Sequence, residues 1–188
     1  MAGQQAEGTT RMNETAQQYI QRITANLEGK QPLAVLSATG KKLERLIQGA
    51  PTAKTRKRPA PGKWSVNEIG AHFADVEVAV GFRLRLILGA PGCPIAAYDQ
   101  DAWVVALHYE KRDPRKSLEY FRVAREANLA LLKSLTPEQW QHYGMHAERG
   151  KETIEQVVRL LAGHDLNHLR QLEKILGTER LRSECITP

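Results

Sequence analysis

Helical periodicity runs through most of this 188-residue chain and constrains its fold more than any other feature. Apolar residues recur every three or four positions, as in helices that bury one face, and strand signals are nearly absent. A first helix is expected near residues 14–27, and four longer ones near 32–48, 66–88, 114–134 and 154–176. Four long amphipathic helices in one chain predict an all-α protein, a four-helix bundle with an extra N-terminal helix.

The starts of these helices are marked by capping signals. Residues 65–68, Ser-Val-Asn-Glu, form a capping box in which the Ser and Glu side chains each satisfy a free backbone N–H group. Trp64 and Ile69 flank it as a hydrophobic staple, and similar boxes begin at Thr136 and Thr153. Gly177 is placed to end the last helix as its C-terminal cap.

One connection, residues 89–113, is longer than the loops of a compact bundle usually are. A short helix is expected near 101–108, and connections of this length typically serve as functional lids. We therefore predict a long crossover that covers the mouth of the bundle. The expected organisation is a single domain over residues 13–180, with polar tails at 1–12 and 181–188.

Composition places the chain among ordinary globular proteins, with 41% hydrophobic and 26% charged residues. No apolar stretch is long enough to span a bilayer, and the first fifteen residues lack the apolar core of a signal peptide. We expect a cytoplasmic protein without a membrane partner. Cys93 and Cys185 are interpreted as free thiols of a reducing compartment.

Much of the net charge of +6 lies in a basic tract at residues 54–58. Such a tract could bind phosphate or nucleic acid through counterion release. Prolines follow it at once and no recognition motif accompanies it, so a solvated loop is the preferred interpretation and no nucleic-acid partner is expected.

Three histidines fall in the apolar stripes of two predicted helices. His72 lies on one, and His164 and His168 lie four residues apart on the other, so that both point the same way. Any one of them alone is better explained as a hydrogen-bonded core residue, but three together predict a metal site with an open coordination position. His142 and His146 share the spacing but flank a glycine without an apolar stripe, and are interpreted as a coincidence in a loop.

Other polar residues are candidates for supporting roles. Asp75 and Asn128 could hold the second nitrogens of the ligands, although a simple salt bridge explains Asp75 equally well. Arg122 or Arg125 could pair with a substrate carboxylate, or lie on a solvated helix face. No carboxylate cluster accompanies the histidines, which favours Zn²⁺ or Ni²⁺ over Mg²⁺ or Ca²⁺.

Residues 59–69, 72–77 and 163–171 together resemble the DinB family, also called YfiT-like, and the likeness in element order extends over roughly residues 30–177. The resemblance implies a four-helix bundle with a long crossover that binds a divalent metal. Carried over residue by residue, the ligands are His72, His164 and His168.

The resemblance also implies the classes of activity to consider. Relatives include transferases and isomerases that use mycothiol, bacillithiol or glutathione, and metal-dependent hydrolases. Our leading hypothesis is a metal-dependent S-transferase that activates a low-molecular-weight thiol toward a small-molecule substrate. The alternatives are a hydrolase with Asp75, Glu77 or His108 as general base, and a non-catalytic metal-binding stress protein. A homodimer is a further open expectation.

Overall fold

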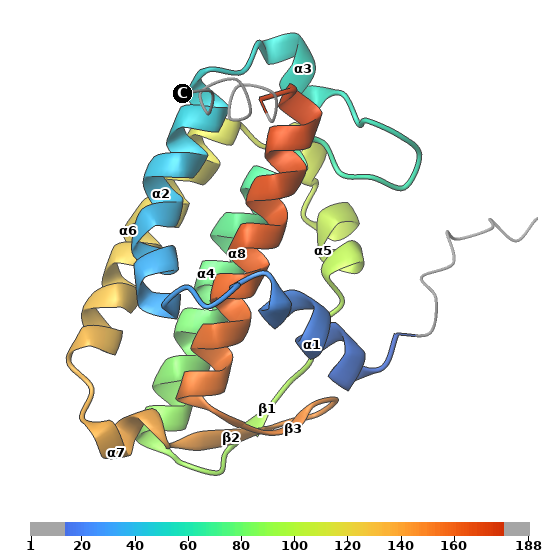
Figure 1. The fold of residues 1–188 in the computed structure, drawn as a ribbon. Coiled ribbons are helices and arrows are strands. Elements are labelled where there is room, and N and C mark those ends of the chain that lie inside the picture. Colours follow the sequence, from blue (N-terminus) through green and yellow to red (C-terminus); the bar gives the residue numbers. More distant parts are fainter. Residues whose placement is uncertain (1–13, 179–188) are drawn as a thin grey trace, which may run out of the picture.

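Four long helices form a bundle in the computed structural model, which describes residues 14–178 (Figure 1). The tails predicted at 1–12 and 181–188 lie outside the described residues. The bundle helices are α2 (Pro32–Gln48), α4 (Val66–Gly89), α6 (Pro114–Lys133) and α8 (Ile154–Leu176). Helix α1 (Ala16–Ala25) packs beside α8, so the predicted all-α bundle with an extra N-terminal helix is confirmed.

The predicted capping residues set the ends of the two helices that carry the histidines. Ser65 caps α4 and Thr153 caps α8, and both capping boxes have their two reciprocal hydrogen bonds. Gly177 ends α8 with a φ of 74°, a left-handed conformation that glycine adopts without steric cost. The helix boundaries therefore follow from local sequence.

Helices α4 and α6 run in the same direction, opposite to α2 and α8 (Figure 1). The crossover returns the chain from one end of the bundle to the other, and it contains β1 (Pro94–Ile95), α5 (Gln100–Ala106) and the short 3-10 helix η1 (Tyr109–Lys111). The predicted long crossover with its short helix is thus confirmed.

The two parallel helices approach closely at Gly81, where a Cβ atom would stand 2.5 Å from Oδ1 of Asn128.

A small sheet that the sequence did not predict lies at one end of the bundle. Strands β2 (Tyr143–His146) and β3 (Gly150–Thr153) form a hairpin, and β1 pairs with β2 in parallel. Strands of two and four residues are too short to show a period in the sequence. The short helices α3 (Thr52–Arg56) and α7 (Pro137–Trp140) complete the described elements.

The basic tract is largely solvated, as the sequence predicted, although part of it is helical rather than loop. Lys54 and Arg56 on α3 are exposed, and so is Lys57, which follows it. Arg58 pairs with the buried carboxylate of Glu68, the acidic member of the α4 capping box. Among the described helices, none is long and apolar enough to cross a membrane.

A buried guanidinium joins all four helices of the bundle. Arg125 of α6 donates to the Leu36 carbonyl of α2 at 2.9 Å and to Oε1 of Glu77 on α4 at 2.7 Å. It also donates to both carboxylate oxygens of Asp165 on α8, at 2.7 and 3.1 Å. Arg125, Glu77 and Asp165 are at most 4% exposed. Buried charges are tolerated when paired and hydrogen-bonded in this way.

We expect Arg125→Met to lower the free energy of unfolding by about 3–5 kcal/mol, because it leaves two carboxylates buried without their cation. Arg122→Met is the matched control: Arg122 is exposed on the same helix, and its loss should change stability by less than about 0.5 kcal/mol. Urea unfolding monitored by circular dichroism compares them. Equal midpoints for the two variants would contradict the assigned role of Arg125.

Candidate metal centre

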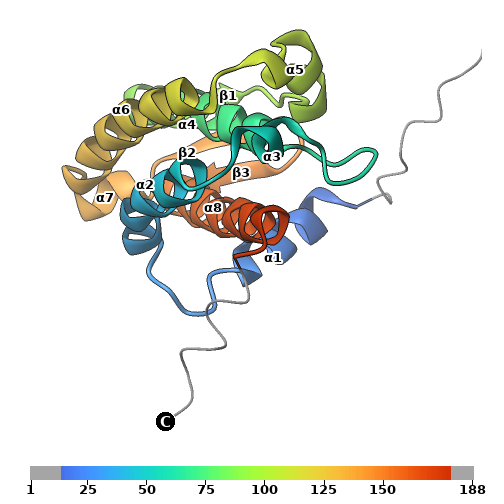
Figure 2. The ribbon, with the colours of Figure 1, turned by 90° about the horizontal axis from the view of Figure 1, so that it is seen from above.

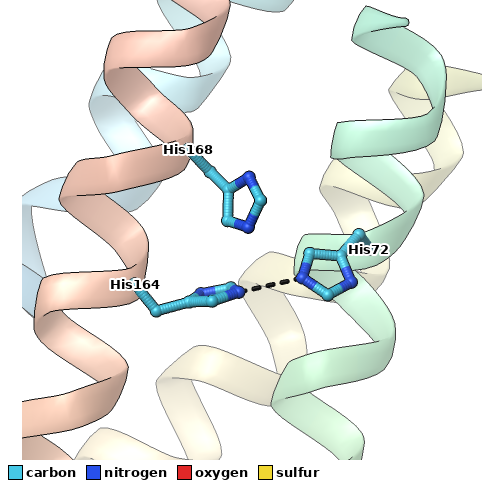
Figure 3. Close-up of side chains that lie close together, drawn as sticks. All are labelled: His72, His164 and His168. Carbon is cyan, nitrogen blue, oxygen red and sulfur yellow. Dashed lines mark hydrogen bonds between the residues drawn. The ribbon is translucent and has the colours of Figure 1, made fainter. Parts of the chain in front are cut away.

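The three predicted histidines converge between α4 and α8 (Figure 3). Nε2 of His72 lies 2.8 Å from Nε2 of His164, and one nitrogen from each of the three rings lies within 4.8 Å of the others. His164 and His168 are one turn apart on α8 and present their rings to the same space, facing His72 on α4. No carboxylate or thiol of the described residues belongs to this group.

All three imidazoles are buried, with 2% of His72, 8% of His164 and 6% of His168 exposed. Burial lowers the pKa of His72 well below its ordinary value, and the neighbouring His168 and His164 lower it further. Burial, reinforced by His164, lowers the pKa of His168 to about 3. His72 and His168 are therefore neutral near pH 7, and a neutral imidazole keeps the lone pair that a metal ion needs.

Aromatic side chains form the walls of the cluster. The Trp64 ring stacks on His168 at 5.9 Å and meets His72 edge-on at 4.8 Å, measured between ring centroids. Phe73 makes edge contacts with His164 and His168. The sequence assigned Trp64 only to the hydrophobic staple, and its position against the imidazoles emerges from the fold. These walls surround the cluster with apolar surface, which strengthens electrostatic interactions inside it.

The outer nitrogen of His168 has a partner that the sequence interpretation missed. Nδ1 of His168 lies 2.9 Å from Oε1 of Gln171, three residues further along α8. This contact orients the ring and leaves Nε2 facing the other histidines. Spacing of three residues on one helix face could have identified Gln171 in advance. Nδ1 of His164 is buried without a hydrogen bond, 3.9 Å from Oδ1 of Asp165.

The acidic neighbour of His164 is held in its ionised form. Burial by itself would raise the pKa of Asp165, but the Arg125 guanidinium and His164 together outweigh this effect and the pKa lies below its ordinary value. The site is therefore bordered by a fixed negative charge on α8. The bidentate pairing of Asp165 with Arg125 links the metal centre to the hydrogen-bond network that joins the four helices.

The residues predicted to support the ligands make their hydrogen bonds elsewhere. Asp75 accepts from the Tyr109 hydroxyl at 2.7 Å and from Arg112 at 2.9 Å, which corresponds to the salt-bridge interpretation. Asn128 donates to the backbone and the carboxylate of Glu77. Arg125 is buried among protein groups and is not placed to receive a substrate carboxylate.

The structure also shows where most of the other residues considered in the sequence analysis lie. Glu77 is 1% exposed and paired with Arg125, and the His108 side chain is 64% exposed and lies 3.5 Å from Glu110. His146 lies in β2, outside the three-histidine group, so the four-residue spacing it shares with His142 is not that of a helix. Cys93 is a partly buried free thiol beside the core, and Cys185 lies outside the described residues.

The arrangement fits a borderline transition metal. Nitrogens that share one ion at about 2.1 Å in tetrahedral geometry stand roughly 3.4 Å apart. That value lies between the 2.8 Å that separates Nε2 of His72 from Nε2 of His164 and the upper limit of 4.8 Å. Three imidazole nitrogen donors without a carboxylate suit a borderline transition metal rather than magnesium or calcium.

Comparison with known proteins places the chain in a family. The sequence pattern that defines the DinB superfamily matches residues 36–172, most of the chain. The chain therefore belongs to the DinB superfamily, and the resemblance found in the sequence is confirmed.

Curated relatives carry names that refer to a metal. "Putative metal-dependent hydrolase YfiT" of Bacillus subtilis is 25% identical over 161 residues, which cover 84% of this chain and 90% of the relative. Two proteins of Oceanobacillus iheyensis with the same kind of name are 26% identical over 117 and 115 residues, 62% and 61% of this chain and 66% of each relative.

A solved structure shares the fold. YfiT from Bacillus subtilis, described as "a probable metal-dependent hydrolase with an unusual four-helix bundle topology", superposes with a TM-score of 0.70. The superposition covers 91% of this chain and 94% of YfiT at 23% identity. The likeness supports the bundle described above.

Gln171 should contribute to metal affinity through His168. We expect Gln171→Leu to weaken zinc binding about 10- to 100-fold, because the ring loses the acceptor that orients it. Gln171→Glu keeps an acceptor oxygen and should retain affinity within a fewfold of wild type. Competition with a chromogenic chelator measures both. Equal affinities for Gln171→Leu and wild type would contradict this role.

Proposed function

We propose that this protein is a metal-dependent transferase that activates a low-molecular-weight thiol toward a small electrophilic substrate. His72, His164 and His168 would hold zinc or nickel. An ion held by three histidines retains an open coordination position and lowers the pKa of a thiol or water that reaches it. The aromatic walls of the cluster would limit competing water.

The composition of the site is the observation that carries the choice of a thiol. The three-histidine group includes no carboxylate of the described residues, and the nearby acids Glu68, Asp75, Glu77 and Asp165 are engaged by arginines. An ordinary thiol ionises near pH 8.5, whereas bulk water ionises near 15.7. A thiol therefore depends less on a neighbouring general base, and such a site favours it as the nucleophile.

A metal-dependent hydrolase is the second candidate. It is favoured by the names of the relatives from Bacillus subtilis and Oceanobacillus iheyensis. This activity would place water where the first candidate places a thiol. Of the general bases expected for it, Asp75 and Glu77 each border a groove, and they are paired with Arg112 and Arg125 respectively.

Metal binding is the first prediction to test. Protein purified without an affinity tag should hold about one equivalent of zinc or nickel, and the double variant His164→Ala, His168→Ala should lose more than about 90% of it. His108→Ala removes an exposed histidine and should retain the metal. Elemental analysis measures the content. Equal metal in wild type and the double variant would overturn the site.

The reaction class is tested separately on the metal-loaded protein. Glutathione, bacillithiol and mycothiol are each offered with a chlorinated aromatic acceptor, and a parallel panel contains esters and amides. We expect turnover that depends on both metal and thiol. Turnover of esters or amides alone would establish the hydrolase instead, and metal binding without any turnover would favour a non-catalytic metal-binding protein.

A further inference from the structure

A second cluster of polar side chains lies where the small sheet meets the bundle (Figures 1 and 2). Its members come from α4, from the crossover and from the hairpin of β2 and β3. We call it the sheet-end cluster; it consists of Arg83, Tyr98, His146, Arg149 and Glu152. Arg83 follows His72 by eleven residues, which places it on the same face of α4 but about 16 Å further along the axis. The cluster is therefore separate from the metal centre.

The crossover holds Arg83 in place. Nη2 of Arg83 donates to the Ala96 carbonyl at 2.9 Å, and its guanidinium carbon lies 5.1 Å from the centroid of the Tyr98 ring. Tyr98 in turn stacks on Trp103 of α5, with 4.1 Å between the ring centroids. These contacts orient the guanidinium, and the hydrogen bond to Ala96 uses one of its five N–H groups.

The hairpin brings His146 toward the same place. His146 and Gly144 are two residues apart in β2, so they face the same side of the sheet, and both are buried. A Cβ atom on Gly144 would stand 3.1 Å from the Ile87 side chain, and Ile87 lies one turn after Arg83 on α4. The buried side of β2 therefore faces the part of α4 that carries Arg83.

The cluster contains one cation without a counterion. Arg149 and Glu152 pair with each other through two hydrogen bonds of 2.6 and 2.9 Å. Arg83 is partly buried and forms no ion pair with a carboxylate of the described residues, including that of the exposed Glu148 in the hairpin turn. Burial lowers the pKa of Arg83 from its ordinary value, but an arginine stays charged at neutral pH.

His146 supplies a buried donor without an acceptor. The Glu148 backbone N–H donates to Nδ1 of His146 at 3.2 Å, so in the neutral ring Nδ1 is the acceptor and Nε2 carries the proton. Burial, reinforced by Arg149, lowers the pKa of His146, which keeps the ring neutral near pH 7. His146 is 3% exposed, and its Nε2 has no hydrogen-bond partner in the described part of the chain. Because buried donors are nearly always paired, this N–H group indicates a position for an acceptor from outside the chain.

We propose that Arg83 and His146 bind the carboxylate of a small organic acid between them. A guanidinium binds the two oxygens of a carboxylate through two parallel N–H bonds, and Nε2 of His146 donates to a remaining lone pair. A single unpaired cation matches one carboxylate, whereas a phosphate monoester carries a charge near −2. Residues 147–149 form the turn beside the imidazole, and the ligand enters when this turn shifts.

Isothermal titration calorimetry on the full chain at constant ionic strength tests the proposal, with acetate as the probe and acetamide as its neutral analogue. Acetamide should bind at least about 10-fold more weakly than acetate. Arg83→Gln should weaken acetate binding about 10- to 100-fold, because a hydrogen bond to a charged group is lost. His146→Asn should weaken it about 2- to 10-fold, since Asn keeps an acceptor for the Glu148 N–H but does not extend to the position of Nε2.

Arg85→Gln is the matched control, because Arg85 is exposed on another face of α4 and its loss should leave the affinity unchanged. Circular dichroism establishes that each variant is folded, and Arg83→Lys, which keeps the charge without the planar fork, replaces Arg83→Gln if that variant does not fold. No saturable binding of acetate up to about 100 mM would overturn the proposal, and so would equal affinities for wild type and the Arg83 variant.

The double variant His164→Ala, His168→Ala separates this site from the metal centre. It should bind acetate as wild type does, because the sheet-end cluster contains no metal ligand. Loss of acetate binding in the double variant would place the carboxylate at the metal centre and overturn the proposal. These outcomes are independent of the proposed reaction, since binding is measured without turnover.

Discussion

The Arg125 guanidinium is the interaction on which the arrangement of the bundle depends. From α6 it donates hydrogen bonds to α2, α4 and α8, and each of these four bonds ends on a buried oxygen. Two of its partners lie close in sequence to the histidines: Asp165 follows His164, and Glu77 lies five residues after His72 on the same helix. Because the network fixes α4 against α8, it also fixes the spacing of the three imidazoles.

Because of the direction in which the helices run, different sides of α4 have different roles. The crossover lets α6 run parallel to α4, and Gly81 allows the two to pack closely enough for Asn128 to contact Glu77. One side of α4 then faces α8 and carries His72, while the side that bears Phe82 stays open between α5 and α6. The metal centre thus occupies one side of α4, and another side of the same helix borders two grooves.

Much of the fold and the core of the site could be predicted from sequence. Helix boundaries were predictable because capping boxes and glycine caps act through neighbours within a few residues, as at Ser65 and Gly177. The convergence of His72, His164 and His168 was predictable because helical phasing puts them on buried faces. Strands β2 and β3 were not predictable, since four residues are too few to show a period. Arg125 looked like a surface group, because the sequence does not reveal the partners that neutralise a charge.

The sequence by itself therefore determined the helices, their buried faces and the three histidines, because these depend on periodicity and on contacts with near neighbours. Tertiary structure alone decided what the polar residues do. It paired Asp75 with Tyr109 and Arg112, buried Arg125 between Glu77 and Asp165, and placed Trp64 against the imidazoles. These pairings join residues up to 104 positions apart, as for Trp64 and His168, and they follow from how the helices pack rather than from any local preference.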